Sequence, residues 1–181
     1  GYASTTIEAI AGRAEVAAST VYAVFGSKLG ILRAIRAAWH DRSRIRDITY
    51  GDLGDAGPEE RLRRLAQGTR QQWETGAEVT AIYTSAAAAD PEAAAELKLA
   101  LEGRKKGMEH FAKGLEPHLR PGLDVARAAA IIEALCLAEV YNLLVRRSGW
   151  PAEEYQDWLY QILENELLPS PRSSPAGASI D

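Results

Sequence analysis

The amino-acid sequence predicts an all-α protein, in which a small N-terminal head of helices precedes a larger helical body. Alanine, leucine, glutamate and arginine dominate the 181 residues, and all four favour helices. The β-branched residues are too few for a protein rich in sheet. Apolar residues recur at helical spacing between breaks marked by proline and glycine, so the pattern favours several helices of moderate length.

The first predicted helix covers residues 6–14. Thr5 is expected to cap it, and Glu8, three residues later, completes a capping box. Apolar residues then repeat on one face of the segment. Residues 15–17 interrupt this pattern and predict a tight turn.

A second short helix is predicted over 18–25, with Val21 and Phe25 facing inward. Gly26 is expected to end it, because glycine accepts the left-handed conformation common at a helix C-terminus. Ser27 then caps a longer third helix. Residues 1–46 are therefore predicted to form a helical head.

The body is predicted to span 47–168, and a flexible tail to occupy 169–181, where proline, serine and glycine accumulate. Residues 47–57 look like a loop, and Pro58 suits the first turn of the helix that follows. Glycine and proline residues then mark helix ends, which gives helices over 58–75, 77–89, 91–116, 123–147 and 152–168.

Charge is distributed unevenly between the head and the rest. Residues 1–46 carry seven arginines and lysines against three carboxylates, whereas the remainder carries 14 against 22. A basic head on an acidic body is expected when only the head meets phosphates. No apolar run was expected to reach the roughly 18 residues of a membrane span, so no membrane partner is predicted. One cysteine, Cys136, excludes an intrachain disulfide and fits the cytoplasm.

Enzymatic function is not predicted. The sequence has no glycine-rich phosphate loop, no nucleophile elbow and no histidine pair at metal-ligand spacing. We therefore expect no catalytic residue, no metal and no cofactor.

Two short helices joined by a three-residue turn describe a helix-turn-helix, whose second helix would enter the major groove of DNA. Its outer face carries small residues that allow close approach to base edges, namely Ala18, Ser19 and Ala23. Hydroxyl and amine groups suited to phosphates follow nearby, on Thr6, Thr20, Tyr22 and Lys28.

The segment T-T-I-x-x-I-A-x-x-A-x-V-A-x-x-T-V-Y-x-x-F-x-S-K-x-x-I-L, from Thr5 to Leu32, resembles the DNA-binding signature of the tetracycline-repressor (TetR) family of bacterial regulators. The rest resembles that family's regulatory domain in helix number and length only. The resemblance implies a homodimer that binds a near-palindromic, double-stranded operator and is released by a small-molecule effector. It also implies a further helix before Gly1.

Two positions depart from the family pattern. Glu15 stands where glycine is usual, and Ala17 stands where serine is common. Alanine lacks a capping oxygen, which costs about 1 kcal/mol at a helix start. Glu15 places an anion near the expected phosphates. The alternative function is therefore a small-molecule-binding protein of the same fold whose DNA binding is degenerate or non-specific.

The two last helices suggest a dimer. The helix over 123–147 is apolar almost all round and the helix over 152–168 is amphipathic, so two copies would build a four-helix bundle between subunits. The alternative is that both helices only cover their own core. Glu139 lies among apolar residues and must find a donor, either within the protein or in a ligand.

Large side chains of the middle helices suggest an effector pocket, with the alanines of 86–89 leaving room opposite. The alternative is ordinary core packing. Trp39, near the end of the third helix, lies where a filled pocket would shift the head. The candidate ligand-binding residues are Trp73, Tyr83, Met108, Phe111, Glu139 and Tyr141.

Overall fold

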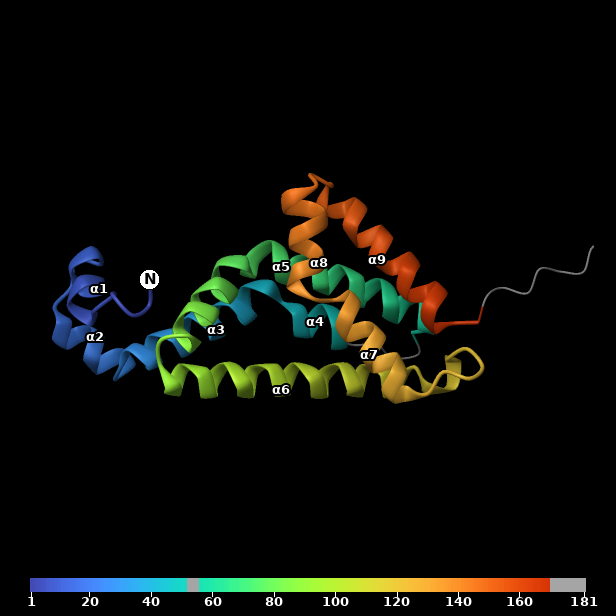
Figure 1. Ribbon diagram of the computed structural model, residues 1–181, viewed down its shortest axis with the longest axis horizontal. Coiled ribbons are helices and arrows are strands. Elements are labelled where there is room, and N and C mark those ends of the chain that lie inside the picture. Colours follow the sequence, from blue (N-terminus) through green and yellow to red (C-terminus); the bar gives the residue numbers. More distant parts are fainter. Residues whose placement is uncertain (52–55, 170–181) are drawn as a thin grey trace, which may run out of the picture.

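The computed structural model describes residues 1–51 and 56–169 and confirms an all-α protein, because every regular element in these ranges is a helix. The molecule is elongated, with α1 and α2 at one end and α3 leading from them into the body (Figure 1). Of the predicted tail, residues 170–181 lie outside the described residues, as do residues 52–55 of the predicted loop.

The head begins with α1 (Ile7–Arg13), which starts one residue later than predicted. The predicted cap is wrong by one position, because the Thr6 hydroxyl accepts the bond from the Ala9 N–H at 3.1 Å. Thr5 instead donates its hydroxyl to the carbonyl of Gly1 at 2.9 Å.

The second helix, α2 (Ala18–Phe25), has the predicted bounds, and Gly26 ends it with a φ of 69°. The third helix, α3 (Lys28–Ser43), is capped by Ser27, whose side chain accepts a hydrogen bond from the Gly30 N–H at 3.1 Å. These signals are local, since each cap involves residues within three positions of one another.

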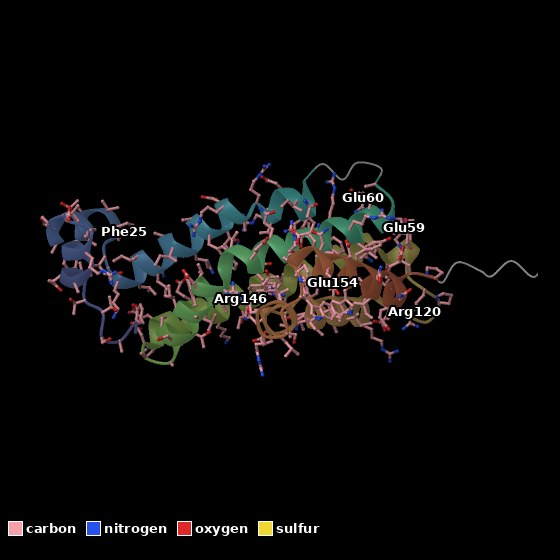
Figure 2. The ribbon with its side chains drawn as sticks, turned by 90° about the horizontal axis from the view of Figure 1, so that it is seen from above. Phe25, Glu59, Glu60, Arg120, Arg146 and Glu154 are labelled. Atoms are coloured by element: carbon pink, nitrogen blue, oxygen red, sulfur yellow. The ribbon has the colours of Figure 1, made fainter. Side chains whose placement is uncertain are left out.

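The head has its own small core, made of Ile7, Ala11 and Val21. Phe25 was predicted to join it, but this side chain is 37% exposed and lies on the surface of the head (Figure 2). The core of the head is made of small and medium side chains and does not include Phe25, so the inward expectation for Phe25 is wrong.

A short helix, α4 (Ile45–Tyr50), begins before the predicted loop and extends into it, so the loop prediction is wrong for residues 47–50. The position of α4 depends on contacts with α5 and α6, which are distant in the sequence. Thr49 is buried, α4 lies along α5, and the Tyr50 ring meets Phe111 edge-on with centroids 6.2 Å apart.

The two predicted helices over 58–75 and 77–89 are one continuous helix, α5 (Pro58–Ala87), so the predicted break at Gly76 is wrong. Gly76 allows a neighbouring helix to approach closely. A Cβ at this position would lie 2.2 Å from Cε2 of Trp39. The glycine therefore serves the packing of α3 on α5 and does not end a helix.

The next helix, α6 (Pro91–Gly114), is capped by Asp90, whose carboxylate accepts a hydrogen bond from the Glu92 N–H at 2.8 Å. It ends two residues before the predicted boundary and is followed by the 3₁₀ turn η1 (Glu116–His118).

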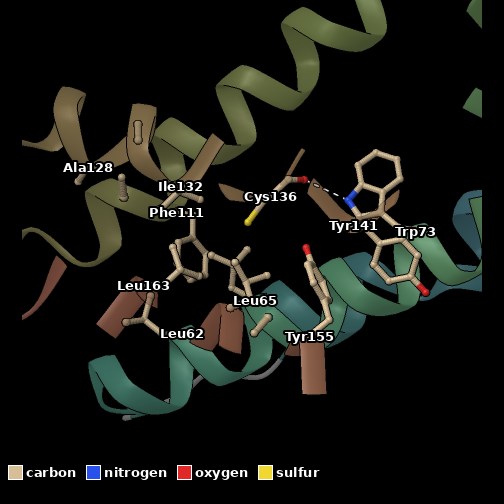
Figure 3. Packing of buried hydrophobic residues seen from close by; sticks show 14 of the residues in the cluster. Leu62, Leu65, Trp73, Phe111, Ala128, Ile132, Cys136, Tyr141, Tyr155 and Leu163 are labelled. Carbon is tan, nitrogen blue, oxygen red and sulfur yellow. Dashed lines mark hydrogen bonds between the residues drawn. The ribbon is translucent and has the colours of Figure 1, made fainter. Parts of the chain in front are cut away.

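The predicted helix over 123–147 is divided into three pieces, so its predicted continuity is wrong. These are α7 (Val125–Leu135), α8 (Ala138–Tyr141) and the π-helix η2 (Asn142–Arg147). The break lies at Cys136, whose carbonyl accepts the indole N–H of Trp73 at 3.0 Å (Figure 3). The last helix, α9 (Ala152–Leu167), nearly matches its predicted bounds.

In the body, α5 is the central helix and packs against α3, α4, α6, α8 and α9, while α7 packs against α6 and α9 (Figure 1). The helical stretch 125–147 is long and apolar enough to cross a membrane by length and composition alone. This corrects the expectation that no such stretch exists. It is weak evidence for a membrane, because core helices of water-soluble proteins pass the same test.

Candidate DNA-binding head and ligand cavity

The outer face of α2 is open to solvent. Ser19, Thr20, Tyr22 and Ala23 are all exposed, and the Tyr22 side chain is 48% exposed. α2 contacts α1 and α3 through its opposite face, where Val21 is buried. The four residues are thus placed as a major-groove face requires, and their contact with DNA stays a prediction.

The other three candidate DNA contacts are partly engaged within the protein. Ala18 is half-buried against the head core. The Nζ of Lys28 lies 4.0 Å from the centroid of the Tyr2 ring, a cation–π contact. The Thr6 hydroxyl caps α1, although its residue is exposed. DNA would have to share Lys28 and Thr6 with these internal contacts.

Exposed valines on the same surface were missed. Val24 is 66% exposed on α2, and Val16 in the preceding turn is 44% exposed. Spacing gave no signal for the exposure of Val24, because a residue three positions from the buried Val21 is expected on the same helix face. Such methyl-bearing side chains are suited to thymine methyl groups.

The positive charge of residues 1–46 is spread further than the sequence indicated. Helix α3 has 16 residues and is about 24 Å long at about 1.5 Å per residue, so it carries most of the arginines away from α2. Arg33 forms an ion pair with Glu96 on α6. Arg13 is on α1 and Lys28 begins α3, so these two cations belong to the helices that pack directly against α2.

The turn between α1 and α2 carries both departures from the family pattern. Glu15 adopts a φ of 55°, in the left-handed region that favours glycine. Ala17 is the N-cap of α2 and provides no side-chain hydrogen bond. The turn is formed, but both of its special positions are occupied by residues that stabilise it poorly.

A cavity of about 140 Å³ lies where α3, α5 and α6 meet. Its walls are mainly apolar and aromatic, with a few cationic and amide groups. The lining residues are Arg36, Trp39, His40, Gln72, Trp73, Val79, Thr80, Tyr83, Leu97, Ala100, Leu101 and Arg104.

The polar atoms of the three large aromatic side chains are bonded to the backbone. The indole N–H of Trp39 donates to the Gln72 carbonyl at 3.3 Å, and that of Trp73 donates to Cys136 at 3.0 Å. The Tyr83 hydroxyl donates to the Leu32 carbonyl at 3.1 Å. These bonds fix the rings and leave their apolar faces available to a ligand.

Arginine groups supply positive charge at the cavity. The guanidinium carbon of Arg104 lies 5.1 Å from the centroid of the Trp73 ring, and this guanidinium also donates to the Cys136 carbonyl. Arg36 lines the cavity from α3. Burial, followed by the charges of Arg36 and Arg46, lowers the pKa of His40, which favours the neutral imidazole.

Of the six predicted ligand-binding residues, the structure brings Trp73 and Tyr83 to this cavity. Phe111 lies deeper, among leucines (Figure 3), and Tyr141 packs edge-on against Tyr155 with centroids 5.0 Å apart. Met108 is half-buried against the body core and does not line the cavity.

Glu139 was expected to be a buried carboxylate in need of a donor, and this expectation is wrong. The residue is exposed on α8, because the break at Cys136 turns the following helix relative to α7. Burial places the pKa of the Cys136 thiol above its ordinary value, so this group is the inert core thiol that the sequence suggested.

Arg104 is the main cavity residue that sequence reasoning missed, although a signal was present. It lies on one stripe of α6 with Leu97, Ala100, Leu101 and Met108, at spacings of three, four and seven residues. An arginine within an apolar stripe indicates a buried or half-buried charge.

Comparison with known proteins supports the resemblance in the head. Residues 1–35 match the family model for bacterial regulatory proteins of the tetR family. A search of curated proteins finds no match by sequence.

Two solved structures share the fold over nearly the whole chain. One is a candidate transcriptional regulator from Saccharomonospora viridis in complex with choline, with a TM-score of 0.67 and 18% identity over 94% of this chain and 90% of that chain. The other is the ketosteroid transcriptional regulator KstR2 of Mycobacterium tuberculosis, with a TM-score of 0.60 and 22% identity over 94% and 88%. The head therefore resembles the tetR family of bacterial regulatory proteins in sequence, and the chain shares its overall fold with these two solved structures.

Proposed function

We propose that this protein is a ligand-responsive, DNA-binding transcriptional regulator, and that it acts as a repressor released from a palindromic operator by a small molecule. One observation carries the proposal, namely that α3 joins the two candidate sites. Near its start Ile31 packs against the head core, and further along Trp39 lines the cavity. A ligand in the cavity thus contacts the helix that holds the DNA-binding face.

The coupling step would be a population shift. Trp39 packs so closely over Gly76 that there is no room for even a methyl group between them. A ligand that displaces this indole therefore has to move α3 relative to α5. Such movement changes where α2 lies, and a dimer whose recognition helices no longer match half-sites about 34–36 Å apart releases its operator.

A homodimer is part of the proposal. Leu137 and Leu143, which lie after the break in the predicted dimer helix, are 39% and 49% exposed in the single subunit. Exposed leucines beside α9 suit an apolar contact with a second copy. We assign residues 1–46 to DNA binding and 47–168 to ligand binding and dimerisation. We place the activity in the cytoplasm and assign no catalytic reaction.

Operator recognition is tested by fluorescence anisotropy with the DNA upstream of the protein's own gene and a scrambled duplex, over a series of salt concentrations. We expect saturable preference for the upstream DNA and a steep loss of affinity with salt. Tyr22→Ala should weaken binding about tenfold, because a good contact contributes about 1–3 kcal/mol. Lys28→Ala should weaken binding to both duplexes.

Lys106→Ala is the matched control, since it removes the same charge from an exposed position on α6. It should leave DNA affinity unchanged. If the Tyr22 and Lys28 variants bind DNA as tightly as the parent, α2 does not dock as proposed.

A second candidate function is favoured by the turn between α1 and α2. The strained Glu15 and the uncapped Ala17 weaken the element that presents α2. The protein would then bind its ligand without sequence-specific DNA binding. Weak and equal affinity for several unrelated duplexes, together with ligand binding in the cavity, would favour this function over the regulator.

A further inference from the structure

We propose that the cavity between α3, α5 and α6 selects small carboxylates, which pair with Arg104 and place an aromatic ring or a short acyl chain against Trp39 and Trp73. The inference deepens the proposed function by giving the chemical class of the effector. Only its regulatory consequence rests on that function, because the binding itself can be measured in the protein alone.

The first argument is charge. Neither Arg36 nor Arg104 forms an ion pair with a carboxylate in residues 1–51 and 56–169. Glu96, the acid beside Arg33 on the neighbouring surface, is already hydrogen-bonded to that arginine and does not line the cavity. No aspartate or glutamate lines the cavity itself. An entering anion would therefore meet cations that no lining carboxylate neutralises.

The second argument is an unused donor. The Nε of Arg104 is buried and has no hydrogen-bond partner among the described residues. A buried donor without a partner costs about 1–3 kcal/mol, and more when the group is charged. A carboxylate that bonds to Nε itself would remove this cost and form a charge-assisted bond, with a second oxygen available to a neighbouring N–H. Because Nε is covered by protein atoms, the Arg104 side chain has to shift toward the ligand for this bond to form.

The third argument is size and shape. A cavity of about 150 Å³ lined by apolar side chains holds benzene in a well-studied case, so the 140 Å³ observed here suits one ring or a short chain. The Trp39 and Trp73 rings, with centroids 6.2 Å apart, supply apolar faces. A larger ligand would need the adjoining hollow of about 520 Å³, which shares Trp73 and Thr80 with this cavity.

The same geometry disfavours a cationic ligand. A quaternary or primary ammonium binds well over a tryptophan face, but Arg104 already lies over the Trp73 ring. A cationic ligand near Arg36 and Arg104 would be repelled by both. The cavity therefore discriminates by sign of charge as well as by shape.

Arg104 also links the ligand to the rest of the body. Its guanidinium and the Trp73 indole share the Cys136 carbonyl, at the point where α7 ends. A carboxylate that draws Arg104 toward itself would weaken one of these two bonds. The break between α7 and α8, next to the exposed Leu137, would then be held less firmly.

The test is isothermal titration calorimetry of the whole chain with matched probes. Benzoate and hexanoate are compared with benzamide and hexanamide, which keep the shape and lose the charge, and with benzylamine, which reverses the charge. We expect at least one carboxylate to bind about tenfold or more tightly than its amide, and benzylamine to bind more weakly still.

Arg104→Gln should reduce carboxylate affinity to that of the amide, whereas Arg104→Lys should retain most of the preference. Lys105→Gln is the control, since it removes one charge from the next, exposed position of α6. Because Arg104→Gln also loses a bond to Cys136, its fold is checked by circular dichroism, and Arg36→Gln provides a second variant with the same expected direction.

Equal affinity for carboxylates and amides, tighter binding of benzylamine, or no binding of any probe would overturn the inference. Operator binding separates this failure from that of the proposed function. Specific operator binding without carboxylate preference would support the proposed regulatory function and contradict the carboxylate effector. Carboxylate preference without operator binding would support the ligand site and contradict the proposed regulatory function.

Discussion

At the scale of single residues, the backbone conformation of Glu15 lowers the stability of the head. Its φ of 55° is accessible to glycine at no steric cost, but holding an ordinary residue there costs about 1 kcal/mol or more. The carboxylate is exposed and forms no ion pair among the described residues, so nothing in these contacts offsets the strain.

Glu15→Gly is therefore expected to stabilise the head by about 1 kcal/mol, since it relieves the left-handed conformation. The measurement is urea unfolding followed by circular dichroism. Glu8→Gly is the control, because it removes the same charge from an exposed position in the first turn of α1. The loss of the acid at the helix N-terminus and the glycine itself should both destabilise α1, by about 1 kcal/mol together. If both variants shift in the same direction, charge and not backbone conformation is responsible.

At the scale of helices, contacts between elements override the signals within them. Gly76 lies near the middle of α5, where its helix propensity argues for a break, yet α5 runs on for 30 residues. The position is buried under Trp39, and the close approach of α3 replaces the side chain that a better helix former would bring. The close packing of α3 on α5 therefore requires glycine at position 76.

Gly76→Ala is expected to destabilise the protein by about 1–3 kcal/mol, because the new methyl group would overlap the Trp39 ring. Helix propensity alone predicts the opposite sign. Thermal unfolding of this variant is compared with that of Gly103→Ala, on α6, where a Cβ would meet no atom within 4 Å. The control should be stabilised by about 0.5–1 kcal/mol, and a stabilised Gly76→Ala would show that α3 does not pack as described.

At the scale of the whole molecule, one helix spans the two candidate sites and the other end of the body offers a surface for a partner. Ile31 meets the head core and Trp39 meets the cavity. Leu137, in the break before α8, and Leu143, on η2, are exposed. Under the proposed function, a ligand in the cavity would change the position of the two heads through the proposed dimer.

Leu143→Glu is expected to weaken the proposed homodimer about tenfold or more, because a carboxylate would be brought into an apolar contact. Sedimentation velocity over a range of protein concentrations measures the effect. Leu99→Glu places the same change on α6, where the leucine is 62% exposed, and should leave association unchanged. A parent protein that stays monomeric at every concentration, or an equal effect of both changes, would contradict this interface.

The sequence by itself determined the features that depend on neighbouring residues. The bounds of α2, the left-handed Gly26, the Ser27 cap and the start of α5 at Pro58 all follow from side chains within a few positions. The helix-turn-helix and its exposed outer face were predictable for the same reason. Caps and turns are satisfied by local hydrogen bonds, so a short stretch of sequence is enough to specify them.

Only the tertiary structure decided where the remaining residues act. The continuity of α5 depends on Trp39, the break before α8 depends on the donors that Trp73 and Arg104 bring to Cys136, and the exposure of Glu139 follows from that break. Each partner is far away along the chain. The energy of such contacts depends on how closely distant segments approach, and periodicity within one segment contains no measure of that distance.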